Sequence, residues 1–151
     1  PIREWNAVDC LYFSLPKTEL PTTSPILHLD GSGRGPINNL TFLSTLSDCA
    51  PSSRVLASAS VIGRKEMGIE QVVELANQQL KTWFGESVKK WDFLRAYRIC
   101  HAVPNCDVVP DLETKKNGIY RCGDYLWLPS IDSAMRSGRL VAESIIASNQ
   151  E

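Results

Sequence analysis

The chain lacks both an excess of one charge and any long hydrophobic run. Its 16 lysine and arginine residues nearly balance 17 aspartate and glutamate residues, giving a formal net charge of −1. This balance gives no electrostatic footprint for nucleic acid or for an anionic membrane surface. No stretch approaches the roughly 18 apolar residues typical of a membrane-spanning helix. The sequence therefore predicts neither a nucleic-acid partner nor a membrane span.

The cysteines lack the even number and dense spacing of a secreted disulfide scaffold. They stand at irregular intervals, at Cys10, Cys49, Cys100, Cys106 and Cys122. A signal-peptide pattern is also missing. We therefore expect reduced, mostly buried thiols and an intracellular protein, cytoplasmic or plastid, rather than a secreted one. Cys100-His101 and Cys106 have no second pair to complete a zinc site, so no metal is predicted.

What is present is the composition of an ordinary globular protein, with 43% hydrophobic and 22% charged residues. The first residue is proline rather than methionine, and we expect the chain to be part of a longer protein. Gly31, Gly33 and Gly35 do not have the spacing of a dinucleotide-binding fingerprint, and Pro36 follows them directly. These glycines indicate a turn.

The first hundred residues show short apolar segments separated by loops that contain proline, glycine, aspartate and serine. Strands are predicted at 8–15, 26–29, 40–46, 55–62 and 91–103. Their spacing, with turns between them, is typical of a meandering antiparallel sheet. A single helix interrupts them at about 68–84, where apolar residues recur with a helical period before Gly85.

The last third of the chain begins with a predicted loop at 105–117. A predicted strand at 118–124 ends in Gly123-Asp124, and a second loop leads to Ser130, a candidate cap for a long helix. Gly138 inside that helix costs about 1 kcal/mol relative to alanine, which a close approach to a sheet or another helix would explain. A strand end that faces a helix N-terminus is a geometry that binds cofactors, because the first N–H groups of a helix are free and carry partial positive charge.

This last segment resembles a known family. The run from Gly118 to Asp124, followed by Pro129-Ser130-Ile131-Asp132-Ser133-Ala134-Met135-Arg136-Ser137-Gly138, is similar to the closing flavin motif of the flavin-containing amine oxidase, protoporphyrinogen oxidase and phytoene desaturase-like superfamily. About 25 residues match closely, with Ala-x-x-Ser-Gly as the specific core. The resemblance implies the C-terminal part of an FAD-dependent oxidoreductase, an enzyme that transfers hydride from a C–H or C–N bond of a small organic substrate to flavin.

The resemblance also implies the fold and the site. The fold class is α/β, a mixed α+β arrangement. Residues 1–104 would form most of a substrate-binding domain built on an antiparallel sheet, and residues 105–151 would supply the last strand and helix of a Rossmann-like FAD-binding layer. The residues implied in cofactor binding are Gly123, Asp124, Pro129, Ser130, Ile131, Asp132, Ala134, Ser137 and Gly138. Asp124 would contact ribityl hydroxyls or pyrophosphate, and the backbone of Ile131 and Asp132 would face the pyrimidine edge.

Two features separate this chain from a complete flavoenzyme. A Gly-x-Gly-x-x-Gly fingerprint is missing, so these residues alone are expected to be inactive and to hold little FAD. No set of residues in the sequence indicates a catalytic acid, base or nucleophile, which suits an enzyme whose cofactor performs the redox step. The alternative is a truncated or interaction module of α/β fold without cofactor. In either case the apolar face of the last helix is expected to promote association.

Overall fold

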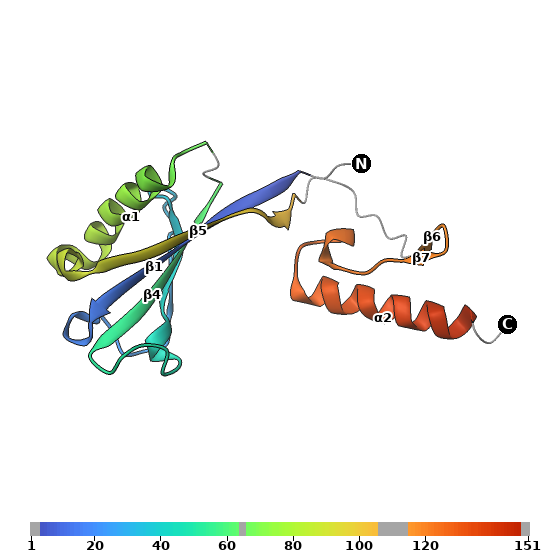
Figure 1. Ribbon diagram of the computed structural model, residues 1–151, viewed down its shortest axis with the longest axis horizontal. Helices are drawn as coiled ribbons and strands as arrows, with labels where there is room; N and C mark the ends of the chain where they lie inside the picture. Colours follow the sequence, from blue (N-terminus) through green and yellow to red (C-terminus); the bar gives the residue numbers. More distant parts are fainter. Residues whose placement is uncertain (1–3, 64–65, 106–114, 149–151) are drawn as a thin grey trace. The chain divides into compact units, whose positions relative to one another are not determined.

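A computed structural model describes residues 4–63, 66–105 and 115–148. Figure 1 shows the elements in chain order. The strands are β1 (Trp5–Pro16), β2 (Leu27–Leu29), β3 (Ile37–Phe42), β4 (Arg54–Ile62), β5 (Asp92–Pro104), β6 (Lys115–Lys116) and β7 (Ile119–Tyr120). The helices are α1 (Ile69–Phe84) and α2 (Ile131–Ser148), with short 3-10 helices η1 (Lys17–Glu19), η2 (Leu43–Thr45), η3 (Gly85–Lys90) and η4 (Asp124–Leu126).

The chain divides into two compact units. Ala7–Ala102 form the larger unit, and the remaining residues at both ends of the chain form the smaller one. The predicted α/β class is confirmed, since the structure combines a five-stranded antiparallel sheet with two helices.

The larger unit is built on that sheet, whose strands lie in the order β2-β3-β4-β1-β5. β1 pairs with β4 in an antiparallel register that places Leu11 opposite Ala59 and Phe13 opposite Ala57. Successive side chains of a strand point to opposite faces of the sheet. The alternating apolar residues of β1 and β4 therefore lie on the same face, which is buried. Leu11 and Ala59 are both 0% exposed.

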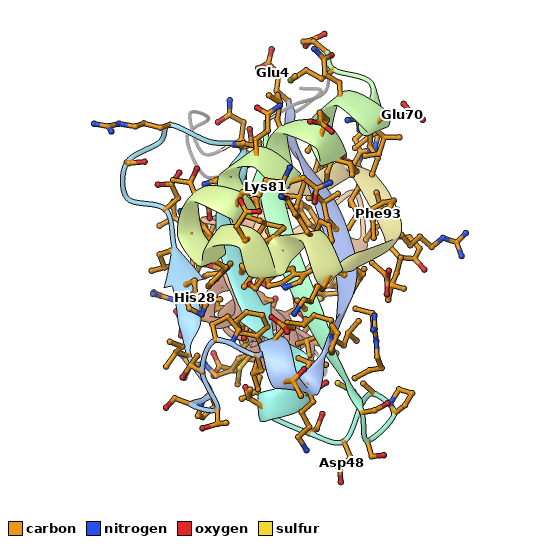
Figure 2. All side chains as sticks on the ribbon, turned by 90° about the vertical axis from the view of Figure 1, so that its left-hand side faces the viewer. Glu4, His28, Asp48, Glu70, Lys81 and Phe93 are labelled. Carbon is orange, nitrogen blue, oxygen red and sulfur yellow. The ribbon has the colours of Figure 1, made fainter. Side chains whose placement is uncertain are left out.

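Helix α1 covers this buried face, and Figure 2 shows it lying in front of the sheet. Val72, Ala76 and Leu80 recur at intervals of four residues, so they lie on one side of the helix, and all three are fully buried. The helix ends where Gly85 adopts a φ of 67°, and its backbone N–H bonds the carbonyl of Lys81. Helix 68–84 and its glycine stop are thus found as predicted.

Among the described residues of this unit, no α-helix covers the opposite face of the sheet. Cys10, Tyr12, Leu56 and Ser58 alternate with the buried set and remain half-exposed. The Cys10 thiol and the Ser58 hydroxyl approach to 3.6 Å across the β1–β4 pair. This uncovered surface is called the open face below.

The smaller unit differs from the predicted strand at 118–124. Only Ile119 and Tyr120 are in a strand, and they pair with Lys115 and Lys116 as a short antiparallel hairpin. Asn117 and Gly118 form its turn with φ values of 52° and 79°, the left-handed pair that a type I′ turn requires. A hairpin closed on itself replaces the longer strand predicted for a Rossmann-like layer. Helix α2 follows η4 as expected.

Of three other predictions, one strand is shifted, one expectation about the thiols is wrong, and one loop lies mostly outside the described residues. The strand predicted at 40–46 runs instead over β3 (Ile37–Phe42), and η2 follows it, with the Thr45 hydroxyl donating to the carbonyl of Phe42 at 2.7 Å. The expectation of mostly buried thiols is wrong, because Cys49, Cys100 and Cys122 are exposed and only Cys10 is partly covered. Cys106 and most of the predicted loop 105–117 lie outside the described residues.

Candidate functional site

The start of α2 is organised by Ser130, as the sequence predicts. Its hydroxyl oxygen accepts a hydrogen bond from the backbone N–H of Ser133 at 3.1 Å, and its carbonyl accepts from the N–H of Ala134 at 3.1 Å. The Ser130 hydroxyl also donates to the Ser133 hydroxyl at 2.9 Å. Ser130 is therefore a helix N-cap that fixes where the first turn of α2 begins.

A second set of hydrogen bonds ties the Gly123 turn to the same helix. The backbone N–H of Gly123 donates to the Ser137 hydroxyl at 2.8 Å, and that hydroxyl donates to the carbonyl of Ala134 at 2.9 Å. Ser137 is only 2% exposed, and both bonds are part-buried. The Ser137 side chain thus joins the Gly123 turn to the helix, 14 residues further along the chain.

Glycine is required at position 123 for two reasons. Its φ of 147° lies in a region that residues with a side chain rarely adopt. A Cβ there would also lie 2.4 Å from the ring of Tyr125. The turn continues as η4, in which the N–H of Trp127 bonds the carbonyl of Asp124 at 2.9 Å and Leu126 is buried at 2% exposure.

This arrangement leaves a small group of polar atoms without partners. Within the described residues, the backbone N–H groups of Ile131 and Asp132 donate to no other residue, as expected for the first turn of a helix. The Asp124 carboxylate likewise forms no hydrogen bond or ion pair with a described residue. A hollow of about 400 Å³ lies beside the start of the helix, lined by Asp132, Met135, Arg136 and Arg139.

The predicted site residues thus fall into two groups. Gly123, Ser130, Ala134 and Ser137 are joined by the hydrogen bonds above, so their polar atoms are engaged within the protein. Asp124, Ile131 and Asp132 offer free polar groups.

The remaining two predicted residues, Pro129 and Gly138, are half-buried and make no such bonds. At Gly138 the expected close approach is not found within the described chain, because a Cβ there would meet nothing within 4 Å.

The apolar face predicted for α2 is found, but it is not the face that is buried. Ile131, Met135 and Ile146 are 81%, 72% and 60% exposed, whereas the buried residues of the helix are Ser133 and Ser137. The polar pair lies against the Gly123 turn and η4. Periodicity identified the two faces correctly, yet it could not tell which one the unit covers.

Sequence reasoning missed three residues of this site. Ser133 completes the capping pair with Ser130, at a position where the capping-box pattern has Glu or Gln instead of serine. Tyr125 fills the space beside Gly123. Arg136 lies over the ring of Trp127, with its guanidinium carbon 4.3 Å from the ring centre. No sequence pattern indicated either of these two contacts.

Two further findings concern the described residues only. None of their helices is long and apolar enough to cross a membrane. No group of three or more histidine, cysteine, aspartate or glutamate side chains among them is placed to hold a metal ion.

A scan against models of known protein families and a search of curated proteins found no match to this chain. The family resemblance therefore rests on the sequence motif from Gly118 to Gly138 alone.

Proposed function

We propose that this chain is the C-terminal part of an FAD-dependent oxidoreductase of the flavin-containing amine oxidase, protoporphyrinogen oxidase and phytoene desaturase-like superfamily. The whole enzyme would transfer hydride from a C–H or C–N bond of an organic substrate to the flavin. The smaller unit would hold part of the cofactor, and the larger unit would bind substrate. An intracellular location, cytoplasmic or plastid, belongs to the same proposal and is supported by the free thiols of Cys10, Cys49, Cys100 and Cys122.

The observation that carries the proposal is the pair of free N–H groups at Ile131 and Asp132. Ser130 caps the helix without occupying either of them, and the Ser137 bond to Gly123 holds the preceding turn against the helix. The motif residues that resemble the family therefore cap the helix and tie the preceding turn to it, while Ile131 at the helix N-terminus stays exposed.

This donor set fits the pyrimidine edge of a flavin. FAD, when bound, supplies the hydride acceptor, and its reduced form carries negative charge near that edge. Two parallel N–H donors and the positive end of the α2 dipole stabilise an anion at this position. The free Asp124 carboxylate suits a different part of the cofactor, where it can accept hydrogen bonds from ribityl hydroxyls. Each residue acts by binding and orienting the cofactor.

The sharpest test removes one N–H while preserving the helix. Proline is well tolerated at the first position of a helix, and Ile131 is that residue in α2. In the full-length protein, Ile131→Pro should weaken FAD binding roughly threefold to tenfold, the range expected for one hydrogen bond, and should lower the flavin reduction potential. Ile131→Ala removes the same side chain but keeps the N–H, so it should bind FAD like the wild type.

A second pair of variants tests the carboxylate. Asp124→Ala should weaken FAD binding about tenfold or more, because a charge-assisted hydrogen bond contributes roughly 1.5–3 kcal/mol. Asp48→Ala, in an exposed loop of the larger unit, is the matched control. Full-length protein that contains no flavin would overturn the proposal and favour the module without cofactor. Equal flavin affinity in Ile131→Pro and Ile131→Ala would remove the helix N-terminus from the site.

A further inference from the structure

The open face of the larger unit contains a hollow of about 440 Å³. It is lined by Tyr12 of β1, Leu56 of β4, and Leu94, Arg95 and Tyr97 of β5. A volume of this size lies within the range of pockets that bind small molecules. All of the lining residues belong to the larger unit, on the side of the sheet opposite α1.

The lining is mostly apolar and partly aromatic. The rings of Tyr12 and Tyr97 meet edge to face, with centroids 6.0 Å apart and an angle of 85° between their planes. Leu94 and Tyr97 are large apolar residues, yet they are 54% and 48% exposed because no described element covers them. Large apolar side chains gathered on an exposed surface are typical of a binding site.

Arg95 gives this hollow a positive charge. Its guanidinium carbon lies 5.2 Å from the centre of the Tyr97 ring, and it forms an ion pair with none of the described carboxylates. The other two arginines of the sheet differ in this respect, since Arg54 pairs with Asp92 and Arg98 pairs with Asp9. Arg95 therefore lies beside the hollow in contact with the Tyr97 ring, and no described carboxylate neutralises its positive charge.

The Tyr12 hydroxyl does not offset that charge. A hydrogen bond with Cys10 raises the pKa of Tyr12, so its hydroxyl stays neutral at physiological pH. The hollow therefore combines one free cation with apolar walls and contains no acidic lining residue.

We propose that the open face binds an organic anion with a flat apolar body, of the aryl carboxylate class. The apolar body packs against Leu56, Leu94 and the edges of the two tyrosine rings, and the carboxylate meets the Arg95 guanidinium. Binding at this place depends only on the larger unit. The identification of the anion as the substrate of a hydride transfer rests on the function proposed above.

The test uses 2-naphthoate as the probe and 2-naphthalenemethanol as its uncharged analogue, titrated into the whole chain without flavin and followed by NMR. We expect saturable shifts at Tyr12, Leu56, Leu94 and Tyr97, and about fivefold tighter binding of the carboxylate, the upper range for an exposed ion pair. Rising salt should reduce this preference. Arg95→Gln should abolish the preference without weakening the alcohol.

Lys81→Gln is the matched control, because it removes one positive charge from the helix-covered side of the same unit (Figure 2). It should leave the preference for 2-naphthoate unchanged. The proposal is overturned by the absence of binding up to the solubility of the probe, by shifts confined to α2, or by an unchanged preference in Arg95→Gln. Because no flavin takes part, failure here leaves the FAD proposal standing, and binding here does not establish it.

Discussion

His28 shows how a single side chain can couple this fold to pH. It belongs to the edge strand β2, and its ring makes edge-to-face contacts with Phe42 at 5.6 Å and Phe84 at 5.3 Å. Its Nε2 atom is buried and has no hydrogen-bond partner in the described structure. Burial lowers the pKa of His28, because the charged imidazolium would lose its hydration among aromatic rings.

The pH dependence of stability follows from the direction of this shift. The folded protein holds the proton less tightly than the unfolded chain, whose histidine pKa is about 6.5. The stabilising contribution of neutral His28 is therefore complete above about pH 6.5 and is lost as pH falls toward the lowered pKa of the folded state. We expect the free energy of unfolding, measured with urea between pH 7.5 and 5.5, to fall with pH more steeply in the wild type than in His28→Phe.

His101→Phe is the control, since it makes the same change at an exposed histidine. It should retain the steep pH dependence of the wild type. The same slope in His28→Phe and in the wild type would exclude a titrating His28 as its source.

Other residues of the fold could not be assigned from sequence because their partners are distant. Gln79 is a buried polar residue of α1 that accepts from the N–H of Ile37 at 2.7 Å and donates to the carboxylate of Asp30 at 3.0 Å. Gly35 is needed beside it, because a Cβ there would lie 2.1 Å from the Gln79 side chain. Helical periodicity places a residue on a face, but it does not reveal that β3 and the loop before it, 40 or more residues away, supply its hydrogen bonds.

At the scale of elements, strands with a buried face were the easiest to predict. In β4 the alternation from Val55 to Val61 was found as expected, because one side of that strand packs under α1. The hairpin of β6 and β7 was missed because its lysines carry no apolar pattern. Asn117-Gly118 was a usable signal, since this pair favours the type I′ turn that the structure contains.

The turn before α2 gives a prediction for a whole element. Ser137→Ala removes the acceptor of the part-buried Gly123 N–H, and a buried donor left unsatisfied costs about 1–3 kcal/mol. We expect local opening of the segment from Gly123 to Trp127, with α2 itself retained because alanine favours helices. Hydrogen exchange of the Gly123 amide should accelerate by roughly one to two powers of ten, the factor that this range of free energy gives.

Ser148→Ala provides the comparison, since Ser148 also donates to a helix carbonyl but is exposed near the end of α2, where its hydroxyl also lies 3.2 Å from that of Tyr120. Its effect on the Gly123 amide should be negligible. Unchanged exchange at Gly123 in Ser137→Ala would mean that the 2.8 Å bond does not hold the turn.

At the scale of the molecule, the two units differ in how completely they bury their apolar side chains. The larger unit encloses a core in which Phe13, Phe42 and Leu80 are no more than 1% exposed. The smaller unit buries two serines of α2 and leaves Ile131, Met135 and Ile146 exposed. Burial of apolar area is the main favourable term in association, so this helix face is the strongest candidate for contact between molecules.

This exposed face should therefore drive self-association of the chain. Its sedimentation coefficient should rise with protein concentration, and the double variant Met135→Gln, Ile146→Gln should suppress much of that rise while keeping good helix formers in α2. The matched control is Leu27→Gln, Leu29→Gln on β2, where the replaced side chains are 56% and 68% exposed. Edge strands can also drive association through their unpaired backbone groups, so the comparison decides between the two surfaces. A rise abolished by the β2 variant and retained by the α2 variant would assign association to the sheet edge. A sedimentation coefficient independent of concentration in the wild type would show that the exposed face of α2 is tolerated in water.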